Sequence, residues 1–167
     1  MAIRIEGGKS TSLIQHLNPN SDRWMVLWDE QVKGDTYSYM AEVFNYKPTL
    51  EIIKMTILEE YNRQVDEEIL LGFKWNDIPI RLSIENQFNY KAAYDIALQS
   101  EGAILPTFKF GTVEKPVYHK FESLEELQDF YFKAIAHVHN TLSKGWKQKD
   151  AVDWKVYEEL LEKYRYT

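Results

Sequence analysis

The stretch from Gly72 to Gln99 restricts the fold of this chain more than any other segment does. Apolar and polar residues alternate on both sides of Asn76 and Asp77, a pattern typical of two half-buried strands joined by a two-residue turn. Asn and Asp tolerate the positive φ angles that such a turn requires. Ser83 follows as a helix N-cap, since its hydroxyl can accept a hydrogen bond from the first turn. We therefore predict a hairpin that leads directly into a helix.

The predicted helix after Ser83 has an apolar stripe and an unusual number of amides and tyrosines. The stripe is expected to be buried, because its members recur four apart: Ile84, Phe88, Ala92 and Ile96. Amides are mediocre helix formers, so their density suggests a role. They either hydrogen-bond nearby loop backbone and fix the hairpin, or form with the tyrosines a contact surface for another subunit. The two interpretations are compatible, and the residues concerned are Asn86, Gln87, Asn89, Tyr90, Lys91 and Tyr94.

The remaining chain continues the alternation of strands and helices. Residues 1–20 are predicted to be an arm or a weak edge strand. Further strands are predicted at residues 23–30, 36–46, 107–111 and 117–121, and helices at 48–66, at 123–144 and from Asp150 or Asp153 onward. Gly34 lies in the predicted turn between the first two of these strands. Ser123 and Glu126 form a predicted capping box, and Gly145 is expected to end that helix.

These elements predict the α+β fold class, with antiparallel β-hairpins packed against about four helices. The expected organisation is an N-terminal arm and β-hairpin at residues 1–47, followed by a helix and an α+β domain at residues 48–167. The two parts are expected to form one compact unit, since 167 residues suffice to bury a core.

Composition restricts the possible partners. The formal charge of −6 argues against a nucleic-acid backbone as the main partner. Cysteine is absent, which excludes disulfides, thiolate chemistry and cysteine-based metal sites. The first residues lack the apolar core of a signal peptide, and no apolar run approaches the roughly 20 residues of a membrane span. We expect neither nucleic acid nor membrane as a partner. The 11 tyrosines and 5 tryptophans favour protein interfaces instead.

Three histidines resemble site residues but fit structural roles better. His137 and His139 lie two apart, whereas two metal ligands on one helix need a spacing of three or four. His119 has no identifiable nucleophile partner, so a packed or exposed histidine is favoured over a general base. No catalytic residue, metal ligand or cofactor is predicted from them.

Other polar clusters also fit structural roles. The acidic residues between Glu122 and Glu126 suit a helix N-terminus, and those at residues 66–68 suit a solvated connector. The glycines and hydroxyls at residues 7–11 lack the first glycine of a phosphate-binding loop. Each of these groups therefore receives a structural interpretation.

Lysines surround Trp146 near the predicted end of the third helix. Lys147 and Lys149 could contact phosphates while Trp146 stacks on a base. The alternative, favoured by the negative net charge, is that the lysines complement a helix C-terminus while Trp146 packs onto the core. We include Trp146, Lys147 and Lys149 among the predicted interaction residues.

Residues from Leu71 to Asp153, about half the chain, resemble a phage-associated family of domains of unknown function, family 4376. Its members have a short hairpin, a helix rich in polar residues, a second aromatic hairpin and a final helix with a Trp-x-x-Lys-type element. The matching segments here are GFKWNDIPIRLSIENQFNYKAAYD, LPTFKFG, VYHKFESLEELQDFY and GWKQKDAVDW. The turn at Asn76 and Asp77 departs from the commoner pattern, which has a glycine there.

Domains of this family are typically encoded near phage tail and structural genes. The resemblance implies a non-enzymatic structural or accessory protein of a tailed bacteriophage particle, in the tail, connector or fibre-attachment region. Its partners would be other virion proteins and further copies of itself, and its location the virion, assembled in the host cytoplasm. Two alternatives stay open. The chain could be a small-ligand-binding or enzymatic domain with a pocket near Glu85, or a cytoplasmic phage factor that binds a host protein.

Overall fold

A computed structural model describes residues 2–18 and 20–165 and confirms the predicted α+β class with antiparallel sheets. The chain forms two compact units, the first from residues 1–61 and 149–167 and the second from residues 62–148. The division falls within helix α1 (Leu50–Leu71) and near the end of helix α3 (Leu124–Asp150). It therefore differs from the predicted division after residue 47.

The first unit contains an antiparallel sheet with strand order β1-β4-β3-β2. Its strands are β1 (Ile3–Gly7), β2 (Ile14–Asn18), β3 (Arg23–Lys33) and β4 (Thr36–Phe44). The predicted β3–β4 hairpin is confirmed, and Gly34 in its turn has a φ of +60°. The arm predicted for residues 1–20 is wrong and the edge-strand alternative is right. Two segments of that region pair with the outer edges of β3 and β4, which satisfies backbone groups that an arm would leave to water.

One face of this sheet is covered by helices from two distant parts of the chain. Trp24 and Trp28 of β3 pack in one core with Ile57 of α1 and Tyr157 of α4 (Trp154–Lys163). The Tyr157 hydroxyl donates a hydrogen bond to the carbonyl oxygen of Leu27 at 2.7 Å. These contacts place the last helix with the N-terminal sheet, which explains why the unit boundary is not at residue 47. Asp153 caps α4 as predicted, accepting from the N–H of Lys155.

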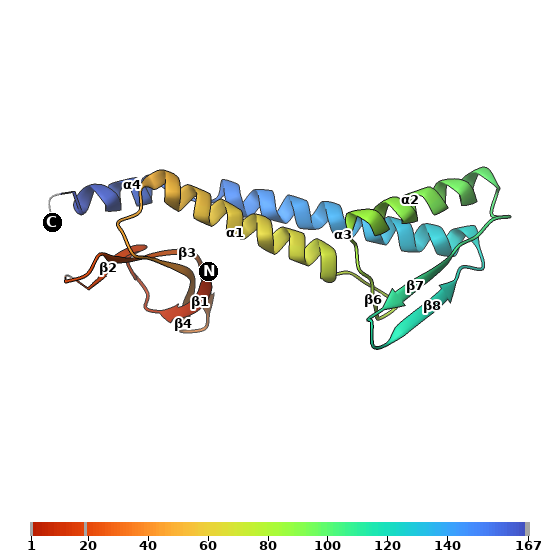
Figure 1. Cartoon of the computed structure of the whole chain (residues 1–167), viewed down its shortest axis with the longest axis horizontal. Helices are drawn as coiled ribbons and strands as arrows, with labels where there is room; N and C mark the ends of the chain where they lie inside the picture. Colours follow the sequence, from red (N-terminus) through yellow and green to blue (C-terminus); the bar gives the residue numbers. More distant parts are fainter. Residues whose placement is uncertain (1, 19, 166–167) are drawn as a thin grey trace. The chain divides into compact units, whose positions relative to one another are not determined.

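The second unit combines the end of α1 with helices α2 and α3 and two strand pairs (Figure 1). Its remaining elements are β5 (Lys74–Trp75), β6 (Ile78–Pro79), α2 (Ile84–Gln99), β7 (Thr107–Gly111) and β8 (Pro116–Lys120). Both antiparallel pairs, β5–β6 and β7–β8, were predicted and are confirmed. Asn76 and Asp77 have φ angles of 49° and 63°, as the turn prediction requires.

The core of the second unit is built largely from aromatic rings. Trp75, Phe110 and Phe130 are almost completely buried, and the rings of Trp75 and Phe130 meet edge to face with centroids 5.4 Å apart. Tyr90 of α2 joins the same cluster, with its ring 5.0 Å from that of Phe130. Helices α2 and α3 and the β7–β8 pair therefore share one core.

Helix α3 begins as predicted but continues past its predicted end. Ser123 accepts from the N–H of Glu126 at 3.1 Å, while the Glu126 carboxylate accepts from the N–H of Glu122 at 3.0 Å rather than from that of Ser123. Gly145 was expected to end the helix but lies inside it, because α3 runs to Asp150. A side chain at Gly145 would overlap Val65 of α1. The glycine therefore permits close approach of two helices and is not a C-cap.

Candidate functional site

Helix α2 is joined to the hairpin by its N-terminal side chains. The Ser83 hydroxyl accepts from the N–H of Asn86, which confirms the predicted N-cap. The side-chain amides of Asn86 and Gln87 donate to the carbonyl oxygens of Arg81 and Leu82, each at 2.8 Å. The interpretation that amides fix the hairpin against the helix is confirmed for these two residues.

The buried face of α2 is formed by Tyr90, Tyr94 and Ala97. The ring of Tyr94 stacks on Tyr131 of α3 with centroids 4.7 Å apart. Burial of the Tyr90 hydroxyl raises its pKa to about 12. Both tyrosines were predicted as part of a contact surface, but in this unit they fill the core and present little surface to a partner.

The stripe that was predicted to be buried is instead the outward face of α2. Ile84 is 87% exposed, Phe88 71% and Ile96 48%, and Ala92 lies half-buried between its larger neighbours. The prediction is wrong because α2 carries two apolar ridges on opposite sides, and the ridge with Tyr90 and Tyr94 meets the aromatic core. Several large apolar side chains exposed next to one another on one surface are typical of an interaction surface. We call this surface, formed by Ile84, Phe88, Ala92 and Ile96, the α2 ridge.

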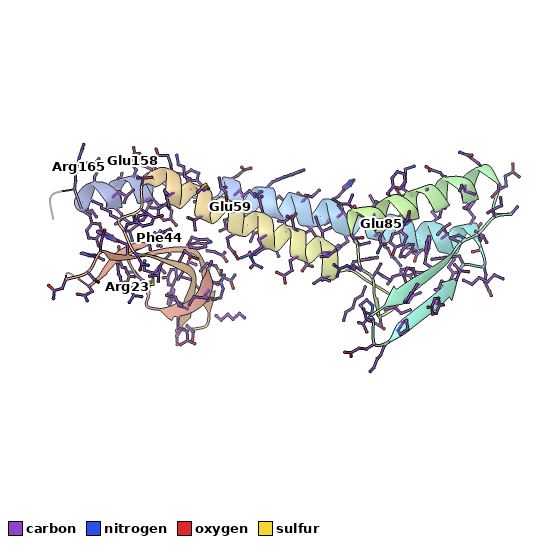
Figure 2. All side chains as sticks on the ribbon, viewed as in Figure 1. Arg23, Phe44, Glu59, Glu85, Glu158 and Arg165 are labelled. Atoms are coloured by element: carbon purple, nitrogen blue, oxygen red, sulfur yellow. The ribbon has the colours of Figure 1, made fainter. Side chains whose placement is uncertain are left out.

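Polar residues border the α2 ridge. Lys91 and Asp95 form an ion pair at 2.6 Å, and this hydrogen bond raises the pKa of the Lys91 ammonium. Asn89 is exposed, as is Glu85 in the first turn, which is labelled in Figure 2. An apolar strip with a polar border has the composition of a protein interface. Of the predicted contact residues, Asn89 and Lys91 therefore lie beside the outward face.

The residues around Trp146 lie on the last turns of α3. Trp146 is 58% exposed, so the expectation that it packs onto the core is wrong. Lys147 is exposed and Lys149 half-buried. Because α3 continues to Asp150, Lys147 and Lys149 lie in its last turn, where positive charges complement the helix C-terminus, as expected. The role of these three residues in an interaction stays a prediction.

Two of the three histidines, His119 and His137, have structural partners. The Nε2 atom of His119 lies 2.8 Å from the Glu126 carboxylate, and its ring packs edge to face on Trp75 and Phe121. The packed-histidine interpretation is therefore confirmed for His119. The Nε2 atom of His137 lies 2.9 Å from the carbonyl oxygen of Glu68. Within residues 2–18 and 20–165, no group of three or more His, Asp or Glu side chains could hold a metal ion.

A second polar cluster lies beside His119. The indole of Trp75 donates to Asp129 at 3.0 Å, and Lys133 forms an ion pair with the same carboxylate at 2.9 Å. The hydrogen bond from Lys133 and then that from Trp75 lower the pKa of Asp129. These contacts satisfy the polar groups at the border of the aromatic core.

Two further features bear on the alternative of a small-ligand site. An open groove of about 200 Å³ lies between α1 and α3 and is lined by Gln64, Val65, Glu68, Thr141, Lys144 and Gln148. It does not include Glu85, where the pocket of the enzymatic alternative was expected. At residues 7–11, Thr11 exchanges hydrogen bonds with the backbone of Gly8 ahead of strand β2, which agrees with the structural interpretation of that segment.

Comparisons with known proteins found no match: no family model, no curated protein and no solved structure is similar to this chain. The resemblance to the phage-associated family therefore stays a prediction. Across the described ranges, every helix is too short or too polar to cross a membrane.

Sequence reasoning missed the orientation of the α2 ridge, although a signal for it was present. Tyr90, Tyr94 and Ala97 recur three to four apart and form a second stripe on the same helix. A helix with two apolar stripes can bury only one of them against a single core. Aromatic side chains bury the most area, so the tyrosine stripe was the better candidate for the core.

Proposed function

We propose that this chain is a non-enzymatic protein–protein interaction module whose binding surface is the α2 ridge. The observation that carries this proposal is the exposure of Phe88, at 71%, and Ile84, at 87%, on a helix whose other face is firmly packed. Holding such side chains in water is unfavourable by an amount that scales with apolar area. A partner that covers them gains that free energy.

The anchoring of α2 supports a binding role. The Ser83 cap and the amides of Asn86 and Gln87 hold its first turn, while Tyr90 and Tyr94 hold its middle. A ridge fixed in this way loses little conformational entropy when a partner binds. The exposed side chains are thus presented on a rigid scaffold.

The biological setting of the module follows from the resemblance alone. Residues 71–153 resemble a family encoded near phage tail genes, and this segment covers most of the second unit. We propose that the chain is a structural or accessory component of a tailed phage particle that contacts other virion proteins and further copies of itself. Its location would then be the virion.

Quantitative mass spectrometry of purified particles tests this proposal. In particles of the phage that encodes the chain, we expect a fixed copy number relative to the major tail protein. Complete absence from washed particles overturns the virion assignment.

A pair of variants tests the surface. Phe88→Asp is expected to reduce incorporation into particles at least tenfold, because it introduces a charge into the centre of the apolar ridge. Val113→Asp is the matched control, since Val113 is 97% exposed in the same unit but lies outside the ridge. Equal incorporation of both variants contradicts a role for the α2 ridge.

A further inference from the structure

Strand β1 forms one edge of the four-stranded sheet and carries no feature that opposes further pairing. It is the first strand in the order β1-β4-β3-β2, and among the residues that the structure describes it pairs with β4 alone. Half of its backbone N–H and C=O groups therefore point away from the sheet. The segment Ile3–Gly7 contains no proline and no lysine, and its register with β4 is unbroken. Such an edge is a template for another strand.

Two other strand edges are protected. Strand β2, at the opposite end of the same sheet, has a break in its register with β3. The carbonyl oxygen of Ile14 in β2 also accepts hydrogen bonds from the hydroxyls of Ser12 and Tyr164, at 2.8 and 3.3 Å. Strand β8 begins with Pro116, which has no N–H to donate, and ends with the exposed Lys120. Bulges, prolines and lysines are features by which edge strands avoid pairing, so β1 differs from both.

We propose that β1 pairs antiparallel with β1 of a second copy, with Ile5 of both copies at the two-fold axis. The surface belongs to the first unit, so this inference goes beyond the proposed role of the α2 ridge and does not depend on it. The two four-stranded sheets become continuous, and the backbone groups that β1 leaves to water bond to each other. A symmetric contact of this kind is closed and produces a dimer.

The charges of β1 argue for a second copy in this register. Arg4 and Glu6 lie on the same face of the strand, and both are exposed. With the axis at Ile5, Arg4 of each copy lies opposite Glu6 of the other, so two pairs of opposite charges form. With the axis at Arg4 or at Glu6, two like charges lie opposite each other instead. An axis midway between Arg4 and Ile5 places a charged side chain opposite an apolar one.

The side chain of Arg4 is already held in place for this contact. Its Nη1 donates to the carbonyl oxygen of Asp29 at 3.1 Å and to the Ser38 hydroxyl at 3.4 Å, and its Nη2 bonds to the Asp29 carboxylate. Within the part of the chain that the structure describes, these bonds use three of the five N–H donors of the guanidinium. The Nε–H and one N–H of Nη2 can therefore donate to Glu6 of the second copy. A side chain fixed in this way loses little conformational entropy on binding.

The other face of β1 is apolar and fits the same register. Ile5 is half-buried against the cluster that contains Leu27 and Tyr39, and in the proposed pair it meets Ile5 of the second copy. Ile3 is 59% exposed. It lies opposite Gly7 of the second copy, where no side chain competes for the space. Pairing thus removes apolar area of Ile3 from water.

The expected affinity is low. A strand of five residues is about 17 Å long. A contact of this length buries less than the roughly 1,200–2,000 Å² of a standard interface. We expect a dissociation constant on the order of 100 μM, a value that a concentration series can measure.

Sedimentation equilibrium of the full chain tests the pairing. The wild-type protein is expected to dimerise between about 10 and 500 μM, and Glu6→Lys to remain monomeric over this range, because it places a positive charge opposite Arg4. Phe88→Asp is the matched control: it alters the α2 ridge and should dimerise like the wild type. A wild-type chain that is monomeric at 500 μM overturns the proposal. Dimerisation that Phe88→Asp abolishes and Glu6→Lys preserves also overturns it.

An exchange of charges tests the pairs directly. Arg4→Glu alone should be monomeric, since it places two negative charges opposite each other. A mixture of Arg4→Glu and Glu6→Lys chains should form a heterodimer, because each position then meets the opposite charge on the other strand. Circular dichroism shows whether each variant is folded. A mixture of folded variants that stays monomeric overturns the proposed register.

The absence of cysteine allows a test that leaves both charges in place. Ile5→Cys should form an intermolecular disulfide under mild oxidation, because residues directly opposite each other have Cα atoms about 4.5–5.5 Å apart, as a disulfide needs. Ile3→Cys is the control: it is the more exposed position, but its two copies lie about 14 Å apart along the strands. Equal or faster cross-linking of Ile3→Cys overturns the register. These outcomes are independent of the proposed function, which is measured by incorporation of Phe88→Asp into particles.

Discussion

Helices α1 and α2 carry apolar residues at the same four-residue spacing, but they use them in opposite ways. In α1, Ile53, Ile57 and Tyr61 are buried against the N-terminal sheet. In α2, Ile84 and Phe88 point into solvent. The difference lies in the other side of each helix. The other side of α1 is mainly polar, with Glu51, Glu59, Asn62 and Asp66 exposed, whereas that of α2 carries two tyrosines.

The comparison shows that periodicity identifies an apolar ridge without giving the direction in which it points. A helix with one such ridge has one way to pack. A helix with two apolar ridges can bury only one of them, and the buried one is the ridge that fits the surface formed by the rest of the unit. The ridge that is not buried in the core stays exposed and is available for binding.

The largest expected effect on stability distinguishes the buried tyrosine stripe of α2 from the exposed α2 ridge. Tyr90→Ala should destabilise the second unit by about 3–5 kcal/mol, because it removes a buried ring from the aromatic core. Phe88→Ala, two residues away, should change the stability of the monomer by no more than about 0.5 kcal/mol. Urea denaturation at low micromolar protein concentration measures both. Comparable losses of stability for the two variants would contradict the difference in packing between the two sides of α2.

The next-largest expected effect on stability concerns the contact between α1 and α3. Gly145→Ala should cost about 1–3 kcal/mol, because the added methyl group would overlap Val65. Val65→Ala in the same chain should restore part of this loss, since it removes the atoms that clash. Thermal unfolding of the two single variants and the double variant measures the coupling. An additive result contradicts close packing at this point.

A pH titration concerns the buried tyrosines of α1 and α2. Burial raises the pKa of Tyr61 in α1 and of Tyr90 in α2 to about 12, above the ordinary value of 10. A raised pKa favours the neutral phenol in the folded state, so its contribution to stability is complete below pH 10 and is lost as the pH rises toward 12. Tyr90→Phe should reduce the loss of stability between pH 10 and 12. An unchanged slope in unfolding free energy would mean that Tyr90 does not titrate differently on unfolding.

The smallest expected effect is at the border of the exposed ridge. Lys91→Ala should leave the free energy of unfolding of the monomer almost unchanged, as is usual for an exposed i,i+4 ion pair. The cost should diminish in 1 M NaCl, because salt screens the pair. A loss in urea denaturation comparable to that of a buried side chain would show that Lys91 has a structural role that the pair alone does not explain.

The candidate surface was only partly predictable. The amides of Asn86 and Gln87 were correctly assigned to the hairpin, because their acceptors at Arg81 and Leu82 lie five residues away in sequence. The burial of Tyr90 depends on Phe108 and Phe130, which are 18 and 40 positions distant. No periodicity within α2 contains that information.

By itself the sequence determined the features that depend on neighbouring residues. The turn at Asn76 and Asp77, the cap at Ser83 and the strand pair β7–β8 were all predicted, since local hydrogen bonds and φ preferences specify them. Only the tertiary structure decided the features that depend on distant partners. The length of α3 past Gly145, the place of α4 beside the N-terminal sheet and the outward direction of the α2 ridge are of this kind. The physical reason is that burial is decided by competition among all apolar surfaces of a unit, and a segment viewed alone shows only its own.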